Sequence, residues 1–100
     1  MSTASSVLLY THPVPRVTTD SRAVARLVLG ERLHALRRRV GLSQAELAAR
    51  LGVSQAAVST WELGKSEPGL LDIAPLCGVL ECSYPVLVGD EPLPPPRRAT

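Results

Sequence analysis

Polar side chains between Ser43 and Lys65 are suited to hydrogen-bonded recognition rather than to bond breaking. The Gln55 amide presents a donor and an acceptor side by side, so it can pair with a partner that offers the two complementary groups. Serine and threonine hydroxyls accompany it at residues 43, 54, 59 and 60. The sequence contains no Ser/His/Asp set, no Cys/His pair and no glycine-rich phosphate loop of the kind that catalysis uses. We therefore expect no enzymatic activity.

Two short helices are predicted to position these side chains. Ser43 is followed three residues later by Glu46, which predicts a capping box at a helix start. Ser54 predicts the start of a second helix. Gly52 lies between them, where a chain leaving a helix commonly adopts a left-handed conformation. The connection of three residues, 52–54, has the length of the turn in a helix-turn-helix.

The apolar residues of this stretch agree with two crossing helices. Leu47, Leu51, Val58 and Trp61 are expected to face inward, and Ala48 is small enough to let the helices approach closely. The outward face of the second helix then carries Gln55, Ala56, Ser59 and Thr60.

Further helices are predicted on both sides of this pair. Apolar residues at helical spacing predict a helix over 29–40, with Asp20 as an earlier N-cap if the helix continues through Gly30. Beyond the pair we expect a helix with Leu70, Ile73, Leu76, Cys77 and Leu80 on one face. Because Pro75 is tolerated in a first turn, this helix is expected to be short, kinked, capped by Asp72, or begun by a loose turn at Leu70. Ser83 caps a last helix, 84–88.

Residues 29–87, which include LHALRRRVGLSQAELAARLGVSQAAVSTWELGKSEP, resemble the lambda-repressor/Cro-like (XRE-type) helix-turn-helix DNA-binding family. The resemblance implies an all-α fold, a compact four- to five-helix bundle around a central helix-turn-helix. We expect a domain at 20–90, a flexible N-terminal arm at 1–19 and a disordered Pro-rich tail at 91–100.

The resemblance also implies roles for single residues on double-stranded DNA. A glutamine at the start of the recognition helix can bond adenine N6 and N7, so Gln55 is expected on a base. Ala56 is expected against a thymine methyl, and Ser59 on a base or sugar. Phosphate contacts are expected from Ser43, Gln44, Ser54, Thr60 and Lys65. Ser43 and Ser54 are also needed as caps whether or not DNA is present.

Arginines end the first helix of this resemblance. Arg37 is implied to pair with Glu62 as a structural clasp, whereas Arg38 and Arg39 are either a solvated helix end or phosphate contacts. Residues 54–63 contain no Lys or Arg, so a monomer should bind DNA weakly. We therefore expect a homodimeric repressor on palindromic DNA. The alternative is an antitoxin or interaction module whose arm, with Val7–Tyr10, or whose tail binds a protein partner. Apolar residues at 71, 86 and 88 hint at self-association.

The composition of the sequence further narrows the class of protein. Residues 16–40 carry seven arginines and two acids, whereas residues 66–96 carry five acids and no base, so the molecule is electrically polarised. Cys77 and Cys82 alone cannot form a four-ligand zinc site, and reduced thiols are expected instead; we expect no metal and no cofactor. No run approaches the ~20 apolar residues of a membrane span. We expect a cytoplasmic protein of a bacterial cell, associated with the nucleoid when bound to DNA.

Overall fold

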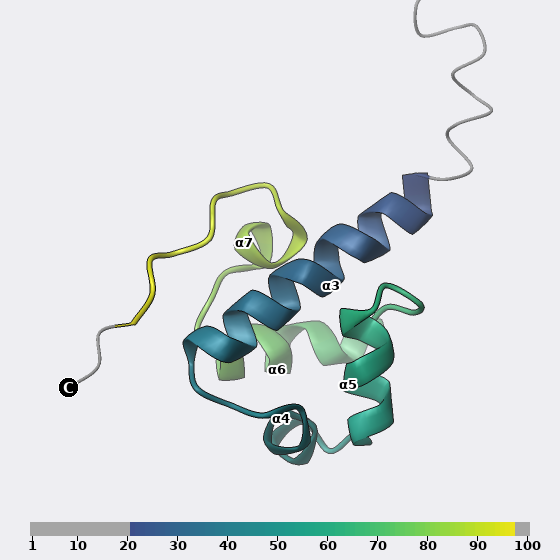
Figure 1. The fold of residues 1–100 in the computed structure, drawn as a ribbon, viewed down its shortest axis with the longest axis vertical. Coiled ribbons are helices and arrows are strands. Elements are labelled where there is room, and N and C mark those ends of the chain that lie inside the picture. Colours follow the sequence, from purple (N-terminus) through teal and green to yellow (C-terminus); the bar gives the residue numbers. More distant parts are fainter. Residues whose placement is uncertain (1–20, 98–100) are drawn as a thin grey trace, which may run out of the picture.

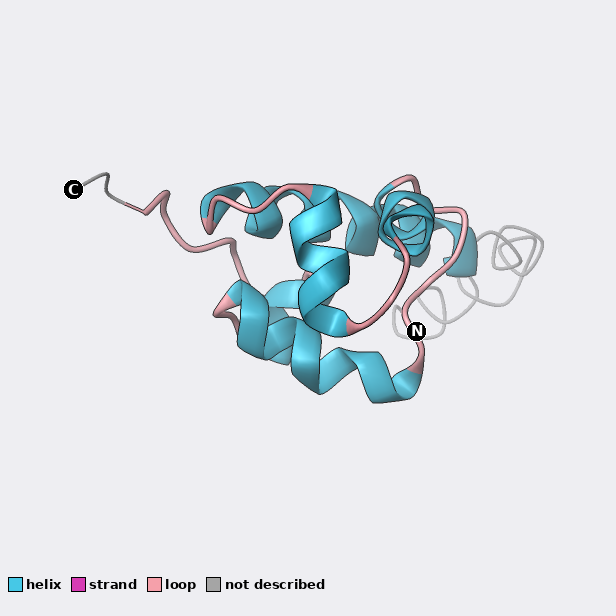
Figure 2. Cartoon of the chain, turned by 90° about the horizontal axis from the view of Figure 1, so that it is seen from below, coloured by secondary structure: helices cyan, strands magenta, loops and turns pink. Residues whose placement is uncertain are grey.

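A computed structural model describes residues 21–97, and this part of the chain folds into five α-helices without a strand (Figure 1, Figure 2). The helices are α3 (Ser21–Arg39), α4 (Gln44–Leu51), α5 (Gln55–Glu62), α6 (Leu70–Leu80) and α7 (Tyr84–Val88). The all-α prediction is confirmed. The predicted arm, 1–19, its neighbour Asp20 and residues 98–100 lie outside the described residues.

The long helix α3 crosses the others and packs against α5 on one side and α7 on the other (Figure 1). Helix α4 packs against α5 and α6, and α6 also packs against α7. Apolar side chains from all five helices and the α3–α4 connection meet in one core. Its buried members are Leu33, Leu36, Leu42, Leu47, Ala48, Val58, Trp61, Leu76, Leu80 and Leu87. The inward positions predicted for the central helix pair are confirmed, with Leu51 only partly buried.

Each described helix ends in a tight backbone reversal in which an N–H bonds the carbonyl five residues earlier. After α4, for example, the Val53 N–H bonds the Ala48 carbonyl at 3.0 Å, and Gly52 adopts the left-handed conformation (φ 72°, ψ 28°). Glycine occupies the left-handed position after every described helix except α6, where Glu81 takes it with φ 56°. These reversals keep the connections short.

Helix α3 runs without a break through Gly30, the residue that weakened the prediction of one continuous helix. The reason lies in the tertiary structure. A Cβ atom at residue 30 would lie 2.6 Å from the carbonyl oxygens of Trp61 and Glu62. Glycine therefore lets the backbone of α3 approach the C-terminal end of α5, a benefit that outweighs its low helix propensity.

Helix α6 begins earlier than a cap at Asp72 would allow, so that option is wrong. Gly69 is the N-cap, and the Asp72 carboxylate accepts its backbone N–H at 3.0 Å. Pro75 therefore lies inside the helix. It cannot bond the carbonyl of Leu71, a residue that is itself 88% exposed. Leu70, expected on the inner face, is also exposed.

The described part of the tail, 91–97, contacts α3. The Arg32 guanidinium donates to the carbonyls of Val86 and Glu91, and Arg39 Nε donates to the Pro95 carbonyl at 3.1 Å. Arg97 also forms an exposed ion pair with Glu81 at 3.4 Å. Arginines of α3 thus hold a chain segment that has no helix of its own.

Candidate nucleic-acid interface

Both predicted helix caps of the central pair are present. The Ser43 hydroxyl accepts the Glu46 N–H at 3.0 Å, and the Glu46 carboxylate accepts the Ser43 N–H at 2.8 Å. The backbone N–H of Ser43, followed by the Ser43 hydroxyl, holds the pKa of the Glu46 carboxyl below its ordinary value. The Ser54 hydroxyl accepts the Ala57 N–H at 3.0 Å. The chain from Gln44 to Glu62 is therefore a helix-turn-helix with both of its helix starts closed by side chains.

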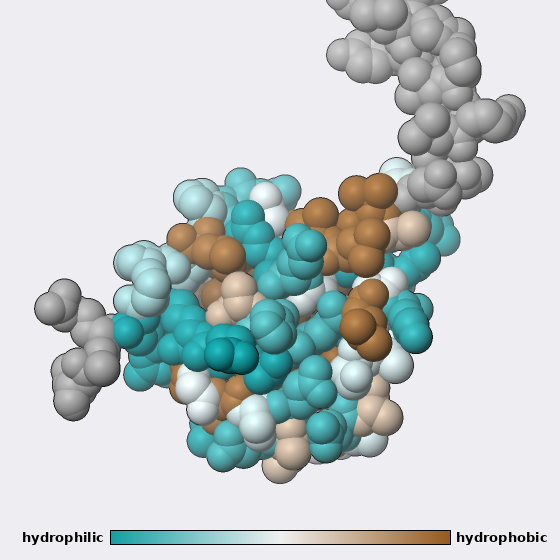
Figure 3. Space-filling view, viewed as in Figure 1, coloured by the Kyte–Doolittle hydropathy of each residue, from teal (hydrophilic) through white to brown (hydrophobic). Residues whose placement is uncertain are grey.

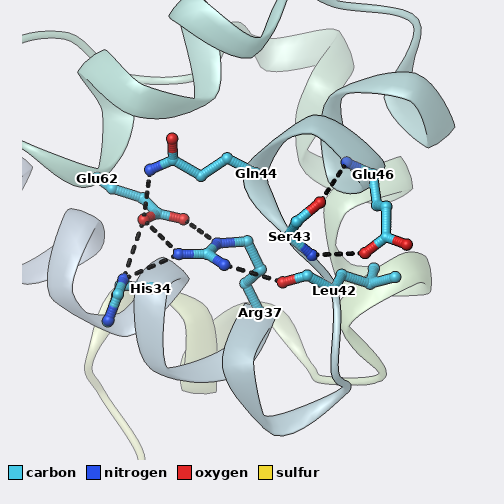
Figure 4. Close-up of polar contacts among 7 residues, drawn as sticks. All are labelled: His34, Arg37, Leu42, Ser43, Gln44, Glu46 and Glu62. Atoms are coloured by element: carbon cyan, nitrogen blue, oxygen red, sulfur yellow. Dashed lines mark hydrogen bonds and ion pairs between the residues drawn. The ribbon is translucent and has the colours of Figure 1, made fainter.

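A partly buried cluster of polar side chains around Glu62 anchors the C-terminal end of α5 (Figure 4). Arg37 donates two hydrogen bonds to this carboxylate, from Nε at 2.6 Å and from Nη2 at 3.0 Å. Its Nη1 donates to the Leu42 carbonyl at 2.8 Å. Both side chains are more than nine-tenths buried. The Arg37–Glu62 pair is therefore present in the structure and ties α3 to α5, and Arg37 also holds the α3–α4 connection through Leu42.

Two further side chains complete the cluster. Gln44 Nε2 donates to Glu62 Oε1 at 3.0 Å, and His34 Nδ1 lies 3.0 Å from the same oxygen (Figure 4). Burial acts to raise the pKa of Glu62, but the hydrogen bonds from Arg37, Gln44 and His34 outweigh it and hold that pKa below its ordinary value. Glu62 is therefore ionised at neutral pH, with its lone pairs engaged.

The opposite end of α5 presents the predicted base-reading residues to solvent. Gln55 and Ala56 are exposed and Ser59 is half-buried. Within the described residues no hydrogen bond engages the Gln55 amide. Ser59 and Gln44 line one shallow hollow of about 380 Å³ with His34, Glu62 and Leu63. The structure thus brings the start of α4 and the outer face of α5 together.

The predicted phosphate-binding residues differ in how free they are. Lys65 is exposed in the loop after α5. Ser54 uses its hydroxyl oxygen as a cap, which leaves the hydroxyl hydrogen available to an anion. The Ser43 hydroxyl is also a cap, but it acts on the Glu46 carboxyl as well. Gln44 has one of its two amide hydrogens committed to Glu62. The Thr60 hydroxyl donates to the Ala57 carbonyl at 2.9 Å and lies 3.0 Å from the Ser66 hydroxyl, so it would have to rotate to reach a phosphate.

The contacts of His34 and Gln44 with Glu62 were not predicted from the sequence. The i, i+3 spacing of His34 and Arg37 was the available signal, since it places both on one face of α3. Gln44 carried no such signal, because its contact with Glu62 depends on the angle between α4 and α5.

Other kinds of site find no support in the described part of the chain. Among residues 21–97, no three His, Cys, Asp or Glu side chains gather as a metal site would require. None of the helices described there is long and apolar enough to cross a membrane.

Comparison with known proteins identifies this architecture. The helix-turn-helix family matches residues 33–87, more than half of the chain, and the chain therefore belongs to the XRE-type helix-turn-helix family.

The chain resembles two regulators in sequence. It is 41% identical over 73 residues to the HTH-type transcriptional regulator DicA of Escherichia coli, which covers 69% of this chain and 54% of that protein. It is 38% identical over 56 residues to Repressor protein C2 of Salmonella phage P22, which covers 56% of this chain and 26% of that protein. The chain thus spans about half the length of the first relative and about a quarter of the second. Both are named for regulation or repression, and neither for catalysis.

A solved structure agrees with these similarities. The nuclear magnetic resonance structure of the DNA-binding domain of the P22 C2 repressor matches with a TM-score of 0.58 at 38% identity. The match covers 63% of this chain and 84% of that domain.

Proposed function

We propose that this chain is a sequence-specific DNA-binding repressor of transcription that acts in the bacterial cytoplasm, with α5 in the major groove. The observation that carries the proposal is the contrast between the two ends of α5. Its C-terminal end is fixed by the Arg37–Glu62 pair, while the Gln55 amide at its start is exposed and unengaged by the described residues. A fixed helix with a free bidentate amide at its N-terminal end is the arrangement that reads base edges.

The family match supports DNA as the partner. The names of the two relatives, a transcriptional regulator and a repressor, support the regulatory role. Ala56, beside Gln55 and exposed, offers a methyl group to a thymine, and Ser59 lies one turn further along α5. Ser43, Gln44, Ser54, Thr60 and Lys65 are the proposed phosphate contacts.

The proposal is tested by selecting binding sites from a randomised double-stranded DNA pool at ~100 mM salt. Wild type is compared with Gln55→Ala and with Asp90→Ala, a matched control in which an exposed polar side chain beyond α7 is removed. We expect wild type and Asp90→Ala to select the same sequence, and Gln55→Ala to lose selection at one base position while staying folded. Failure of folded wild type to enrich any sequence would leave a protein-binding module as the better description.

We further propose that the repressor binds a palindromic site as a homodimer. Helix α5 carries no basic residue in its last turn, and residues 54–63 contain no Lys or Arg, so a single copy gains little from phosphate charge. Leu70 and Leu71 at the start of α6 are 87% and 88% exposed, and a second copy would bury them.

The dimer is tested by sedimentation velocity on wild type and Leu71→Lys, with Asp90→Lys as a control at an exposed residue beyond α7. We expect wild type to dimerise on the selected DNA, Leu71→Lys to bind it as a monomer with reduced affinity, and Asp90→Lys to behave as wild type. Equal dimerisation by Leu71→Lys would place the interface elsewhere, and a wild-type monomer on the palindrome would refute the dimer.

A further inference from the structure

The two cysteines occupy matched positions in the reversal that ends α6. The Cys82 N–H bonds the Cys77 carbonyl at 3.0 Å, and the Glu81 N–H bonds the Gly78 carbonyl at 3.3 Å. This pair of bonds is the Schellman motif, and Cys77 and Cys82 take the two positions whose side chains characteristically touch across it. The left-handed Glu81, with φ 56°, turns the chain so that Cys82 comes back over Cys77.

Electrostatics agree that the sulfurs are neighbours. Burial, followed by the nearby Cys77 thiol, raises the pKa of the Cys82 thiol to about 11. Neither cysteine is in a disulfide, and both are only partly buried, so that a small reagent has access to them. The 3.0 Å backbone bond between Cys82 and Cys77 keeps the two residues neighbours in space, as a disulfide requires.

The guanidinium of Arg39 acts on Cys82 and has one nitrogen without a hydrogen-bond partner within the described residues. Arg39 acts on Cys82 electrostatically in the direction opposite to burial. Its Nη1 is buried and lacks a hydrogen-bond partner within the described residues, although its Nε donates to the Pro95 carbonyl. A guanidinium N–H of this kind can donate a hydrogen bond to the thiolate that forms when one thiol ionises, and so stabilise its negative charge.

We propose that Cys77 and Cys82 are a dithiol modification site that forms an internal disulfide with a small disulfide such as oxidised glutathione. One cysteine, as thiolate, attacks a sulfur of the reagent, and the first glutathione leaves as thiolate. The second cysteine loses its proton to solvent and attacks the sulfur of the mixed disulfide, which releases the second glutathione thiolate. The protein gives up two electrons and two protons, and the reagent is reduced to two thiols.

The position of the pair sets the expected consequence. The bond joins the end of α6 to the segment that leads into α7, at the end of the bundle away from α5 (Figure 1). Neither cysteine belongs to α4 or α5. We therefore expect oxidation to stabilise the fold and to leave the face that carries Gln55 unchanged.

The experiment follows the full chain, first reduced, then incubated with oxidised glutathione, by intact mass spectrometry and thiol titration. We expect the loss of two hydrogen atoms, no free thiol, a monomeric band on a non-reducing gel and a higher midpoint of thermal unfolding. The equilibrium constant for forming the bond should be at least ~10-fold larger for the native chain than for the chain in urea, because the fold preorganises the two thiols.

Cys77→Ser and Cys82→Ser serve as controls, and each is expected to stop at a mixed disulfide with glutathione. The comparison of native and urea-unfolded wild type does not depend on whether these variants fold. Stable glutathione adducts on the native wild type, disulfide-linked dimers, or a native equilibrium constant no larger than that in urea would each overturn the proposal.

Discussion

Arg37 on the last turn of α3 and Glu62 at the end of α5 form a two-point ion pair, with Nε–Oε2 at 2.6 Å and Nη2–Oε1 at 3.0 Å. Both side chains are more than nine-tenths buried, so this pair lies within the packed interior rather than on a solvated rim. Such pairs specify an arrangement more than they stabilise it, because removing charges from water offsets much of their attraction. The arrangement that this pair specifies is the tilt of α5 against α3.

Removing one partner of the pair should be strongly destabilising. We expect Arg37→Ala to lower the free energy of unfolding by ~3–5 kcal/mol, because it leaves the Glu62 carboxylate buried without its counter-charge. The neighbouring Arg38→Ala, which removes an exposed guanidinium, should change it by less than ~0.5 kcal/mol. Urea unfolding monitored by circular dichroism measures both. Similar losses in the two variants would show that the pair has no special structural role.

Because of the same carboxylate, the free energy of unfolding should depend on pH, and the sign of this dependence can be predicted. Since the pKa of Glu62 is lowered by folding, its contribution is complete above the unfolded value of 4.5 and is lost as pH falls through the folded pKa. Glu62→Gln should therefore be destabilised at pH 7, and its deficit relative to wild type should shrink as the pH falls below 4.5. Urea unfolding of both proteins across this range tests the prediction. A deficit that is constant with pH would mean that the charge of Glu62 contributes nothing.

Two glycines inside helices should respond to alanine in opposite directions. Gly30→Ala should destabilise by ~1–3 kcal/mol, because its Cβ would collide with the carbonyls of Trp61 and Glu62 and force α5 outward. Gly78→Ala in α6, where a Cβ meets nothing within 4 Å, should stabilise by ~0.5–1 kcal/mol through helix propensity. Thermal unfolding of the two variants, compared with wild type, shows whether each substitution raises or lowers stability. Stabilisation by both substitutions would show that α3 and α5 can separate without loss.

The left-handed residue after α6 is a site where glycine should improve stability. Glu81 is the one non-glycine residue with positive φ in the part of the chain that the structure describes. Glu81→Gly should relieve about 1 kcal/mol of backbone strain, more than the exposed ion pair with Arg97 contributes. Glu81→Ala removes the same ion pair but keeps the strain, so it should not raise the midpoint of thermal unfolding. An equal effect of glycine and alanine would assign the change to the lost carboxylate.

Local chemistry predicted much of this structure from sequence. The caps at Ser43 and Ser54 and the turn at Gly52 depend on residues within a few positions of one another, and each is present. The pairing of Arg37 with Glu62 was implied by family resemblance, since residues far apart in sequence leave no local signal.

The features that were not predicted depend on distant contacts. Gly30 lowers helix propensity locally, and its benefit exists only because the end of α5 packs against it. Likewise, the contacts of the tail with Arg32 and Arg39 were not predicted. The two arginines donate to backbone carbonyls, and because every residue has a carbonyl, the sequence does not mark which ones are bonded. Whether Gln55 reads a base is equally a property of a partner, and it stays a prediction.

The anchoring of α5 at one end also constrains insertions and deletions in the chain. Each residue of an α-helix rotates the next by ~100° and advances it by ~1.5 Å. With Glu62 held by Arg37, one residue inserted between Ala57 and Val58 would swing Gln55 by that angle away from its present face. Under the proposed function, a new side chain at position 55 alters what is recognised, whereas the number of residues between position 55 and Glu62 must stay the same for recognition through this face.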